Sequence, residues 1–106
     1  MLIATTNELP GRQVVEVLGE VMGLTVRSRN VGSQFGASLK SLVGGELKGM
    51  TKALTESRHE VIDRMVAEAE AKGADAIVAM RFDTSEMGPN WTEICAYGTA
   101  VRTVAE

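Results

Sequence analysis

The chain has 106 residues, of which 44% are apolar and 24% charged, with a formal net charge of -3 at pH 7. This length and composition predict a single folded domain, residues 1–106, and exclude a disordered chain. Because nucleic acids and anionic membranes are bound by clustered Lys and Arg, the acidic balance predicts neither as a partner.

The first residues, MLIATTNELP, have no basic region and no long apolar run, so we expect no signal peptide. No stretch approaches the roughly 20 apolar residues of a membrane span. Cys95 is the single cysteine, so no disulfide can form within the chain. These features together favour a reducing, cytoplasmic location.

The N-terminal part predicts strands separated by a turn. MLIAT at 1–5 is typical of a short strand, and Asn7, Pro10 and Gly11 mark a turn after it. The Val-rich stretch from Gln13 to Arg29 predicts either one long bent strand or two short ones. Its internal glycines, Gly19 and Gly23, are expected at bulges or kinks.

Two helices are expected next. NVGSQF at 30–35 predicts a loop, and QFGASLKSLV at 34–43 predicts a short helix that Gly44-Gly45 ends. A long helix follows from Leu47 to Lys72 and stops before Gly73. Its expected buried stripe is Leu47, Met50, Leu54, Val61 and Met65, widened by Ile62, Val66 and Ala69. The opposite face carries Lys52, Glu56, His59, Glu60, Asp63, Glu70 and Lys72.

The C-terminal part predicts two more strands, 74–86 and 91–104, joined by a turn at 87–90. On the first, we expect one face to carry Ala76, Val78, Met80 and Phe82. Ile77 and Ala79 then lie on the other face, so both faces are partly apolar. One long and one short helix cannot cover both faces of a small sheet, and the uncovered face predicts a homo-oligomer.

The stretch GGELKGMT at 44–51 is similar to the phosphate-binding pattern G-x-x-x-x-G-K-[ST], with Met50 in the lysine position. A phosphate-binding loop of this type needs a strand before it, a helix after it and that lysine. The preceding residues have helical spacing instead. We therefore interpret the stretch as a corner between two helices, where only the N-terminus of the long helix could hold an anion.

Whole-chain motifs resemble those of the YbjQ-like family of small bacterial and archaeal proteins. SLVGGELKGMTKAL, AEAKGADAIVAMRFD and WTEICAYGTAV carry the resemblance. It extends to Gly11–Val15, Val43-Gly44-Gly45, Gly73-Ala74-Asp75-Ala76 and Gly98-Thr99-Ala100-Val101.

The resemblance implies an α+β fold in two layers, in which one long and one short helix pack on a small antiparallel sheet, similar to a dodecin subunit. It also implies a ring of five identical subunits. The family is labelled heavy-metal-binding, and its function is not established. Some relatives carry a cysteine near the position of Leu18, and this chain departs from them because leucine binds no metal.

Four residues are the candidate metal ligands. His59 and Asp63 stand four apart on the long helix, so they share a face, and Glu56 flanks them. Histidine and carboxylates hold zinc and other divalent ions. The competing interpretation is a solvated face with ion pairs such as Glu60–Arg64. Cys95 is the fourth candidate, and its competing interpretation is a small buried apolar residue within a strand.

Other side chains allow further sites. Met50, Met65 and Met80 follow the apolar stripes and are expected in the core, and no M-x-x-M cluster indicates copper. Trp91 and Tyr97 share the strand alternation of Cys95, and either line a small-molecule pocket between subunits or are buried by packing. Asp75, Arg81 and Asp83 predict a salt bridge between subunits.

No catalytic constellation is visible, so we predict that the chain is not an enzyme. The favoured function is a cytoplasmic homo-oligomer, a pentamer, that holds a heavy-metal ion or a small ligand at its subunit interfaces. The alternative is a non-catalytic ring-shaped scaffold that recognises another macromolecule.

Overall fold

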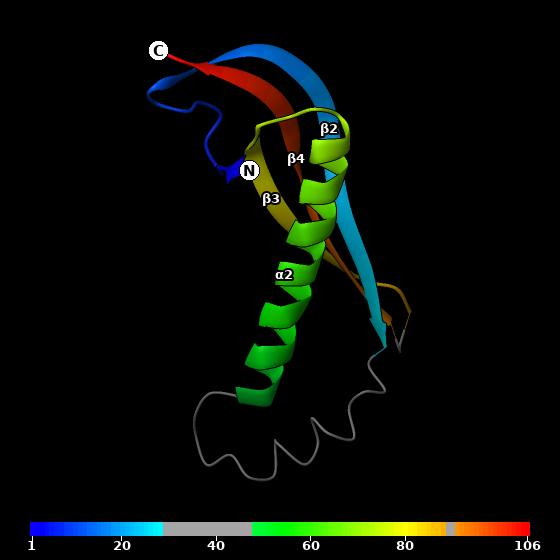
Figure 1. The fold of residues 1–106 in the computed structure, drawn as a ribbon. Coiled ribbons are helices and arrows are strands. Elements are labelled where there is room, and N and C mark those ends of the chain that lie inside the picture. The colour runs from blue at the N-terminus through cyan, green and yellow to red at the C-terminus, as the bar shows by residue number, and fades with distance from the viewer. Residues whose placement is uncertain (29–47, 89–90) are drawn as a thin grey trace.

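A long helix lies across one face of a curved sheet in the computed structural model, which describes residues 1–28, 48–88 and 91–106 (Figure 1). The helix is α2 (Lys48–Ala71), and the strands are β1 (Leu2–Ile3), β2 (Arg12–Ser28), β3 (Ala76–Glu86) and β4 (Trp91–Ala105). The predicted two-layer α+β architecture is therefore confirmed. The predicted short helix at 34–43 and the corner at Gly44-Gly45 lie outside the described residues.

The sheet is mixed, with the strand order β1-β3-β4-β2. β4 pairs antiparallel with both β2 and β3, whereas β1 pairs parallel with β3 through Leu2 opposite Ala76. The expectation of a purely antiparallel sheet was wrong for β1. The chain passes through β2 and α2 before it returns as β3, and this long crossover lets β1 and β3 run in the same direction.

β2 is one continuous strand of 17 residues. Its register with β4 shifts between Val14 and Glu16 and again between Val17 and Gly19. Gly19 has a φ of +109°, which L side chains rarely adopt, so the prediction of a bulge at this glycine is confirmed.

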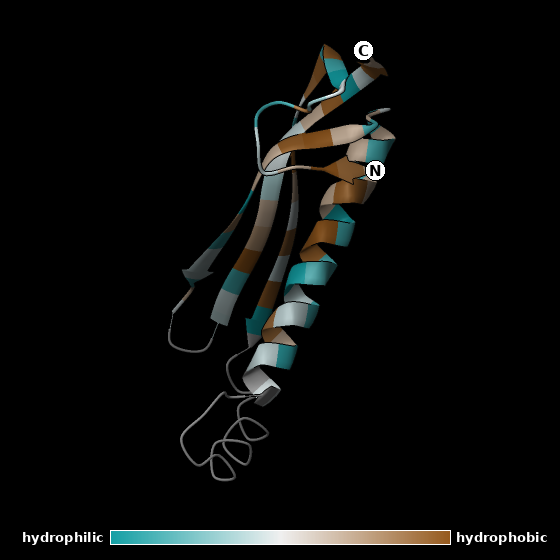
Figure 2. Ribbon diagram, turned by 90° about the vertical axis from the view of Figure 1, so that its left-hand side faces the viewer, coloured by the Kyte–Doolittle hydropathy of each residue, from teal (hydrophilic) through white to brown (hydrophobic). Residues whose placement is uncertain are grey.

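The main core lies between α2 and the sheet. The helix contributes Val61, Met65 and Ala69, and the strands contribute Val21, Ile77, Met80, Ile94, Ala96 and Ala100. Figure 2 shows the apolar bands of the helix and the sheet in two adjacent layers. No helix in the described ranges has the length and apolar character that crossing a bilayer requires.

The buried row of α2 differs from the predicted stripe at its N-terminal end. Ser57 is buried and donates a hydrogen bond to the carbonyl of Ala53 at 2.9 Å, whereas Leu54 is 50% exposed. Burial follows a row spaced by four residues, from Ser57 through Val61 and Met65 to Ala69. Leu54 lies beside this row, so its prediction as a core residue was wrong.

A bulge in β3 changes which side chains share a face. The register with β4 shifts between Val78 and Arg81, and Ala79 has a φ of +54°. Ala76 and Val78 consequently pack with Leu9 and Val101 on the face opposite the helix, whereas Met80 and Phe82 pack on the helix side. The prediction that these four β3 residues share one face was wrong, because the extra residue reverses the alternation.

Asp75 makes its contacts within the chain. Its carboxylate accepts hydrogen bonds from the backbone N–H of Thr103 at 3.0 Å and from the Thr103 hydroxyl, and Arg12 lies 3.7 Å away. This network fixes the start of β3 against the end of β4, and the predicted salt bridge between subunits stays a prediction.

Gly23 sets the distance between the helix and the sheet. A Cβ atom built on Gly23 would lie 1.8 Å from the carbonyl oxygen of Val61 and 2.7 Å from the backbone nitrogen of Met65. The backbone of α2 therefore rests directly on β2 at this point, and any side chain at position 23 forces the two layers apart.

We expect Gly23→Ala to lower the free energy of unfolding by about 3 kcal/mol, since the clash is with helix backbone and overpacking of this kind is costly. The measurement is urea denaturation followed by circular dichroism. Gly11→Ala is the control: its φ is +86° but nothing lies within 4 Å of the added Cβ, so it should cost only about 1 kcal/mol. Equal losses of unfolding free energy in the two variants would contradict the direct contact between the α2 backbone and Gly23.

Candidate functional site

The face of the sheet opposite α2, called here the outer face, carries exposed apolar side chains. Met22, Leu24 and Val26 alternate along β2 and are 42%, 42% and 48% exposed. Tyr97 on β4, opposite Met22 in the register, is 38% exposed. Leu9 packs over the end of this face that carries Ala76, Val78 and Val101. Among the described residues, no member of the buried clusters packs over Met22, Leu24 and Val26.

Cys95 lies within this apolar surface. It stands between Leu24 on β2 and Asp83 on β3 in the sheet register, and it is 8% exposed. Its Sγ lies 3.7 Å from the carbonyl oxygen of Ala96. Directly opposed residues in a sheet have Cβ atoms about 5 Å apart, so the thiol and the Asp83 carboxyl are neighbours.

Burial raises the pKa of the Cys95 thiol above its ordinary value of 9.0, and the negative charges of Glu93, Asp83 and Glu20 raise it further. The outer face is therefore both apolar and acidic around the thiol. A thiol in such surroundings stays protonated near neutral pH and is a poor nucleophile.

The three helix candidates lie on a different layer from Cys95. His59, Asp63 and Glu56 are all on the exposed side of α2, which packs on the opposite face of the sheet. The structure therefore does not bring them to Cys95 within one copy of the chain. Across residues 1–28, 48–88 and 91–106, no three His, Cys, Asp or Glu side chains gather closely enough to hold a metal ion.

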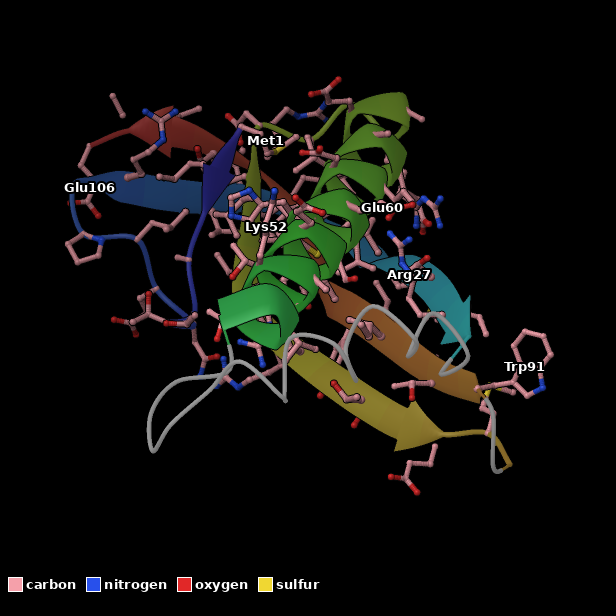
Figure 3. The ribbon with its side chains drawn as sticks, turned by 90° about the horizontal axis from the view of Figure 1, so that it is seen from below. Met1, Arg27, Lys52, Glu60, Trp91 and Glu106 are labelled. Carbon is pink, nitrogen blue, oxygen red and sulfur yellow. The ribbon has the colours of Figure 1, made fainter. Side chains whose placement is uncertain are left out.

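The exposed face of α2 carries ion pairs, which supports the alternative to a metal site on this helix. Glu60 pairs with Arg64 at 2.6 Å, the spacing predicted from the sequence, and it also pairs with Arg27 of β2. Figure 3 shows Arg27 and Glu60 reaching toward each other beside the helix. This part of α2 is an exposed face with ion pairs that also tie the helix to β2.

The aromatic and methionine side chains that were considered as site residues are either buried in the core or exposed on the surface. Met65 and Met80 are buried in the core as predicted, whereas Met22 and Met87 are exposed. Trp91 is 52% exposed and projects from the start of β4, away from the helix (Figure 3). Neither Trp91 nor Tyr97 is buried within one copy, so they do not line an enclosed pocket there.

The GGELKGMT stretch is only partly described. α2 begins at Lys48, within this stretch, so the helix that follows Gly44-Gly45 is confirmed. The residues of this stretch before Lys48, 44–47, lie outside the described ranges.

One cluster was not found from the sequence. Arg58 of α2 stacks on the ring of Phe82 of β3, with 4.8 Å between the guanidinium carbon and the ring centroid. Arg81 and Phe82 also line an open hollow with Thr5 and Met80. The sequence gives no signal for this cluster, because the bulge at Ala79 decides that Phe82 turns toward the helix.

The chain is similar to proteins of one family over nearly its whole length. A family model described as "Putative heavy-metal-binding" (YbjQ) matches residues 1–104. The UPF0145 protein of Acidothermus cellulolyticus is 67% identical over 102 residues, which cover 96% of this chain and 94% of that protein. The UPF0145 protein of Streptomyces coelicolor is 61% identical, with 95% of each chain covered.

A solved structure shares the fold. It is the crystal structure of a protein of unknown function, assigned to the DUF74 family, from Pediococcus pentosaceus. The TM-score is 0.60 at 15% identity, and 98% of each chain is covered. At this identity the likeness supports the architecture and says nothing of a ligand.

We expect Cys95 in the native protein to react with iodoacetamide at pH 8 at least about tenfold more slowly than in the urea-unfolded chain, since burial and a raised pKa both suppress the thiolate. The native rate should rise with pH above 9.0, as the thiolate forms. Mass spectrometry of the alkylated chain measures both rates. Equal native and unfolded rates would show that the thiol is open to solvent.

Proposed function

This chain belongs to the YbjQ-like family, and we propose that it is a non-catalytic binding module that self-associates through the outer face of its sheet. In this proposal the assembly is a cytoplasmic ring, a pentamer, and it holds a heavy-metal ion or a small ligand beside Cys95 at the contact between copies. The observation that carries the proposal is the exposed apolar surface of Met22, Leu24, Val26 and Tyr97 around that thiol.

Contiguous exposed apolar side chains favour a contact surface. Single exposed apolar residues are common, but a patch formed along one strand face and continued on its neighbour is typical of an interaction site. The sequence predicts an oligomer because both faces of the sheet are partly apolar, and the exposed apolar side chains of the outer face agree with that pattern. Burial of these side chains against a second copy would remove their apolar area from water.

The shape of the chain also favours association. Its radius of gyration is 17.2 Å, whereas a compact domain of this size has about 13 Å. A straight strand of 17 residues would span about 56 Å, which is comparable with the longest dimension of 54 Å, although β2 is curved. Such an elongated chain has more surface to bury against neighbours than a compact one.

The donor chemistry near Cys95 fits a soft metal only in part. A thiolate is the ligand that heavy and soft ions prefer, and the Asp83 carboxylate lies beside it in the register. One copy does not complete a coordination sphere, because the described residues gather no third ligand with them. We therefore place the metal between copies, where symmetry repeats each partial set of ligands.

A bound cation would reverse the local electrostatics. The carboxylates of Glu93, Asp83 and Glu20 oppose a bare thiolate, but a metal ion adds positive charge that favours deprotonation of Cys95. Metal uptake should for that reason release a proton.

We expect tag-free protein, purified under reducing conditions and exposed to zinc or copper, to retain a fixed fraction of an ion per subunit. Cys95→Ser should lose most of that metal, whereas His59→Ala should keep it, because His59 lies on the opposite layer. Elemental mass spectrometry after desalting gives the ratio. If Cys95→Ser retains the metal, or if His59→Ala loses it to the same extent, the proposed site beside Cys95 is wrong. The metal would then be bound at the helix face or not at a specific site.

We expect Leu24→Glu to reduce the size of the assembly, since a buried carboxylate would oppose contact at the apolar face. Light scattering coupled to size exclusion should give the native protein a multiple of the 11.3 kDa subunit, five-fold in the proposed ring. Leu54→Glu is the matched control, because Leu54 is 50% exposed, against 42% for Leu24, but lies on α2. A monomeric native protein, or the same loss in both variants, would contradict the proposed interface.

A scaffold for another macromolecule is the second candidate. The carboxylates of Glu20, Asp83 and Glu93 surround the apolar side chains of the outer face, so a basic partner would complement its charge. In the metal experiment, a protein that retains no ion would favour this candidate over the binding of a metal.

A further inference from the structure

A closed ring needs two different contact surfaces on every copy. In a two-fold dimer the same patch meets itself, whereas each copy in a larger cyclic ring presents one surface to the copy before it and another to the copy after it. The proposed function supplies one of the two, the side chains of Met22, Leu24, Val26 and Tyr97 around Cys95, called here the Cys95 surface. The second surface must lie elsewhere on the same chain.

A second group of exposed apolar side chains lies at the other end of the outer face. Val17 is 67% exposed, the highest value among the large apolar residues of the described ranges. Val14 and Leu2 are 37% and 47% exposed. These three residues, Leu2, Val14 and Val17, are called here the valine surface.

The sheet register places Leu2 and Val17 on the same face. Leu2 is opposite Ala76, and Val17 is opposite Val101. Ala76 and Val101 both pack with Leu9 on the side of the sheet away from the helix. Leu2 and Val17 therefore lie on either side of this buried cluster and extend its apolar surface outward.

A bulge brings Val14 to the same face as Val17, although the two residues stand three apart. Val14 is opposite Thr103 and Val17 is opposite Val101, and these partners are two residues apart on β4. The register shift between Val14 and Glu16 supplies the extra residue that keeps both valines on the outer face.

The valine surface and the Cys95 surface face different directions. β2 carries Val14 and Val17 before Gly19, and it carries Met22, Leu24 and Val26 after it. A bulged strand bends, and Figure 1 shows β2 curving over this length. A copy that joins two neighbours through these surfaces therefore turns one relative to the other, as ring closure requires.

Charge opposes the contact of two Cys95 surfaces with each other. The carboxylates of Glu20, Asp83 and Glu93 surround the thiol. Arg81, opposite Tyr97 in the register, adds one cation, so the carboxylates are in excess. Two Cys95 surfaces in contact would bring both sets of carboxylates together, and like charges across an interface disfavour binding.

Beside the valine surface the charges are paired. Arg12 lies two residues from Val14 on β2, and its guanidinium is 3.7 Å from the Asp75 carboxylate. Contact between the Cys95 surface of one copy and the valine surface of another therefore keeps the two sets of carboxylates apart.

We propose that the Cys95 surface of each copy packs on the valine surface of the next copy, and that repetition of this contact closes the ring. The inference rests on the proposed function, since it names the second half of the interface proposed there. Each Cys95 thiol then faces the apolar side chains of a neighbour, and a ligand beside it is enclosed by two copies that contribute different residues.

The test is complementation between two variants that each lack one surface. Leu24→Glu alters the Cys95 surface and Val17→Glu alters the valine surface, and burial of either carboxylate should weaken the contact at least about tenfold. In light scattering coupled to size exclusion, each variant alone should be a monomer of 11.3 kDa. Mixed in equal amounts, they should form a dimer and nothing larger, because only one intact surface of each can meet the other.

Mixtures of two variants on the same surface are the controls. Leu24→Glu with Met22→Glu, and Val17→Glu with Val14→Glu, should stay monomeric because both partners lack the same surface. Circular dichroism checks that each variant is folded, and Val14→Glu replaces Val17→Glu in the test if the latter is not. A monomeric mixture of Leu24→Glu with a folded valine-surface variant, or dimers in a same-surface mixture, would overturn the inference.

Failure of the inference is distinguishable from failure of the proposed function. A native protein that is itself a monomer would overturn both. A native multimer that Leu24→Glu dissociates and Val17→Glu leaves intact would overturn the inference alone, because the Cys95 surface would then meet a surface other than the valine surface.

Discussion

The contact between the backbone of α2 and Gly23 is the constraint on which the arrangement of the two layers depends. A helix normally stands off a sheet by the thickness of its side chains, but here the Val61 carbonyl occupies the place of the missing Cβ. The close approach brings the helix side chains within reach of β2. Arg64 and Lys72 can then donate to β2 carbonyls, and Glu60 can pair with Arg27.

The bulge at Ala79 has a comparable influence at the other side of the sheet. It places Phe82 on the helix side, where Arg58 stacks on the ring, while Arg81 reaches across the edge to Thr5. Gly98 on β4 makes room for this irregularity, since a Cβ there would lie 2.7 Å from the Ile77 side chain. One residue with a positive φ thus places Phe82 beneath Arg58 and divides the apolar side chains of β3 between the two buried clusters.

Much of the fold could be predicted from the sequence, because long apolar periodicities and glycines are local signals. The helix from Leu47 to Lys72 agrees with α2 to within one residue at each end, and the bulge at Gly19 follows from its residue type. The faces of β3 could not be predicted, since strict alternation fails at a bulge that no glycine or proline marks. Leu54 was misplaced because burial follows a row four residues apart, in which Ser57 takes the inward position.

The candidate site was predicted less well than the fold. Residue types alone put His59 and Cys95 in one set of ligands, and only the layer order shows that the sheet separates them. The stacking of Arg58 on Phe82 joins residues far apart in the chain, which spacing along the sequence does not reveal.

The cations on β2 have a consequence for how such a chain behaves when concentrated. A sheet with two open edges can add copy after copy and grow into a fibre. Here Lys72 and Arg64 of α2 already donate to the carbonyls of Glu20 and Leu24, so the addition of a further strand along this part of β2 is disfavoured. Cations from the helix therefore oppose open-ended polymerisation through the middle of this 17-residue edge strand.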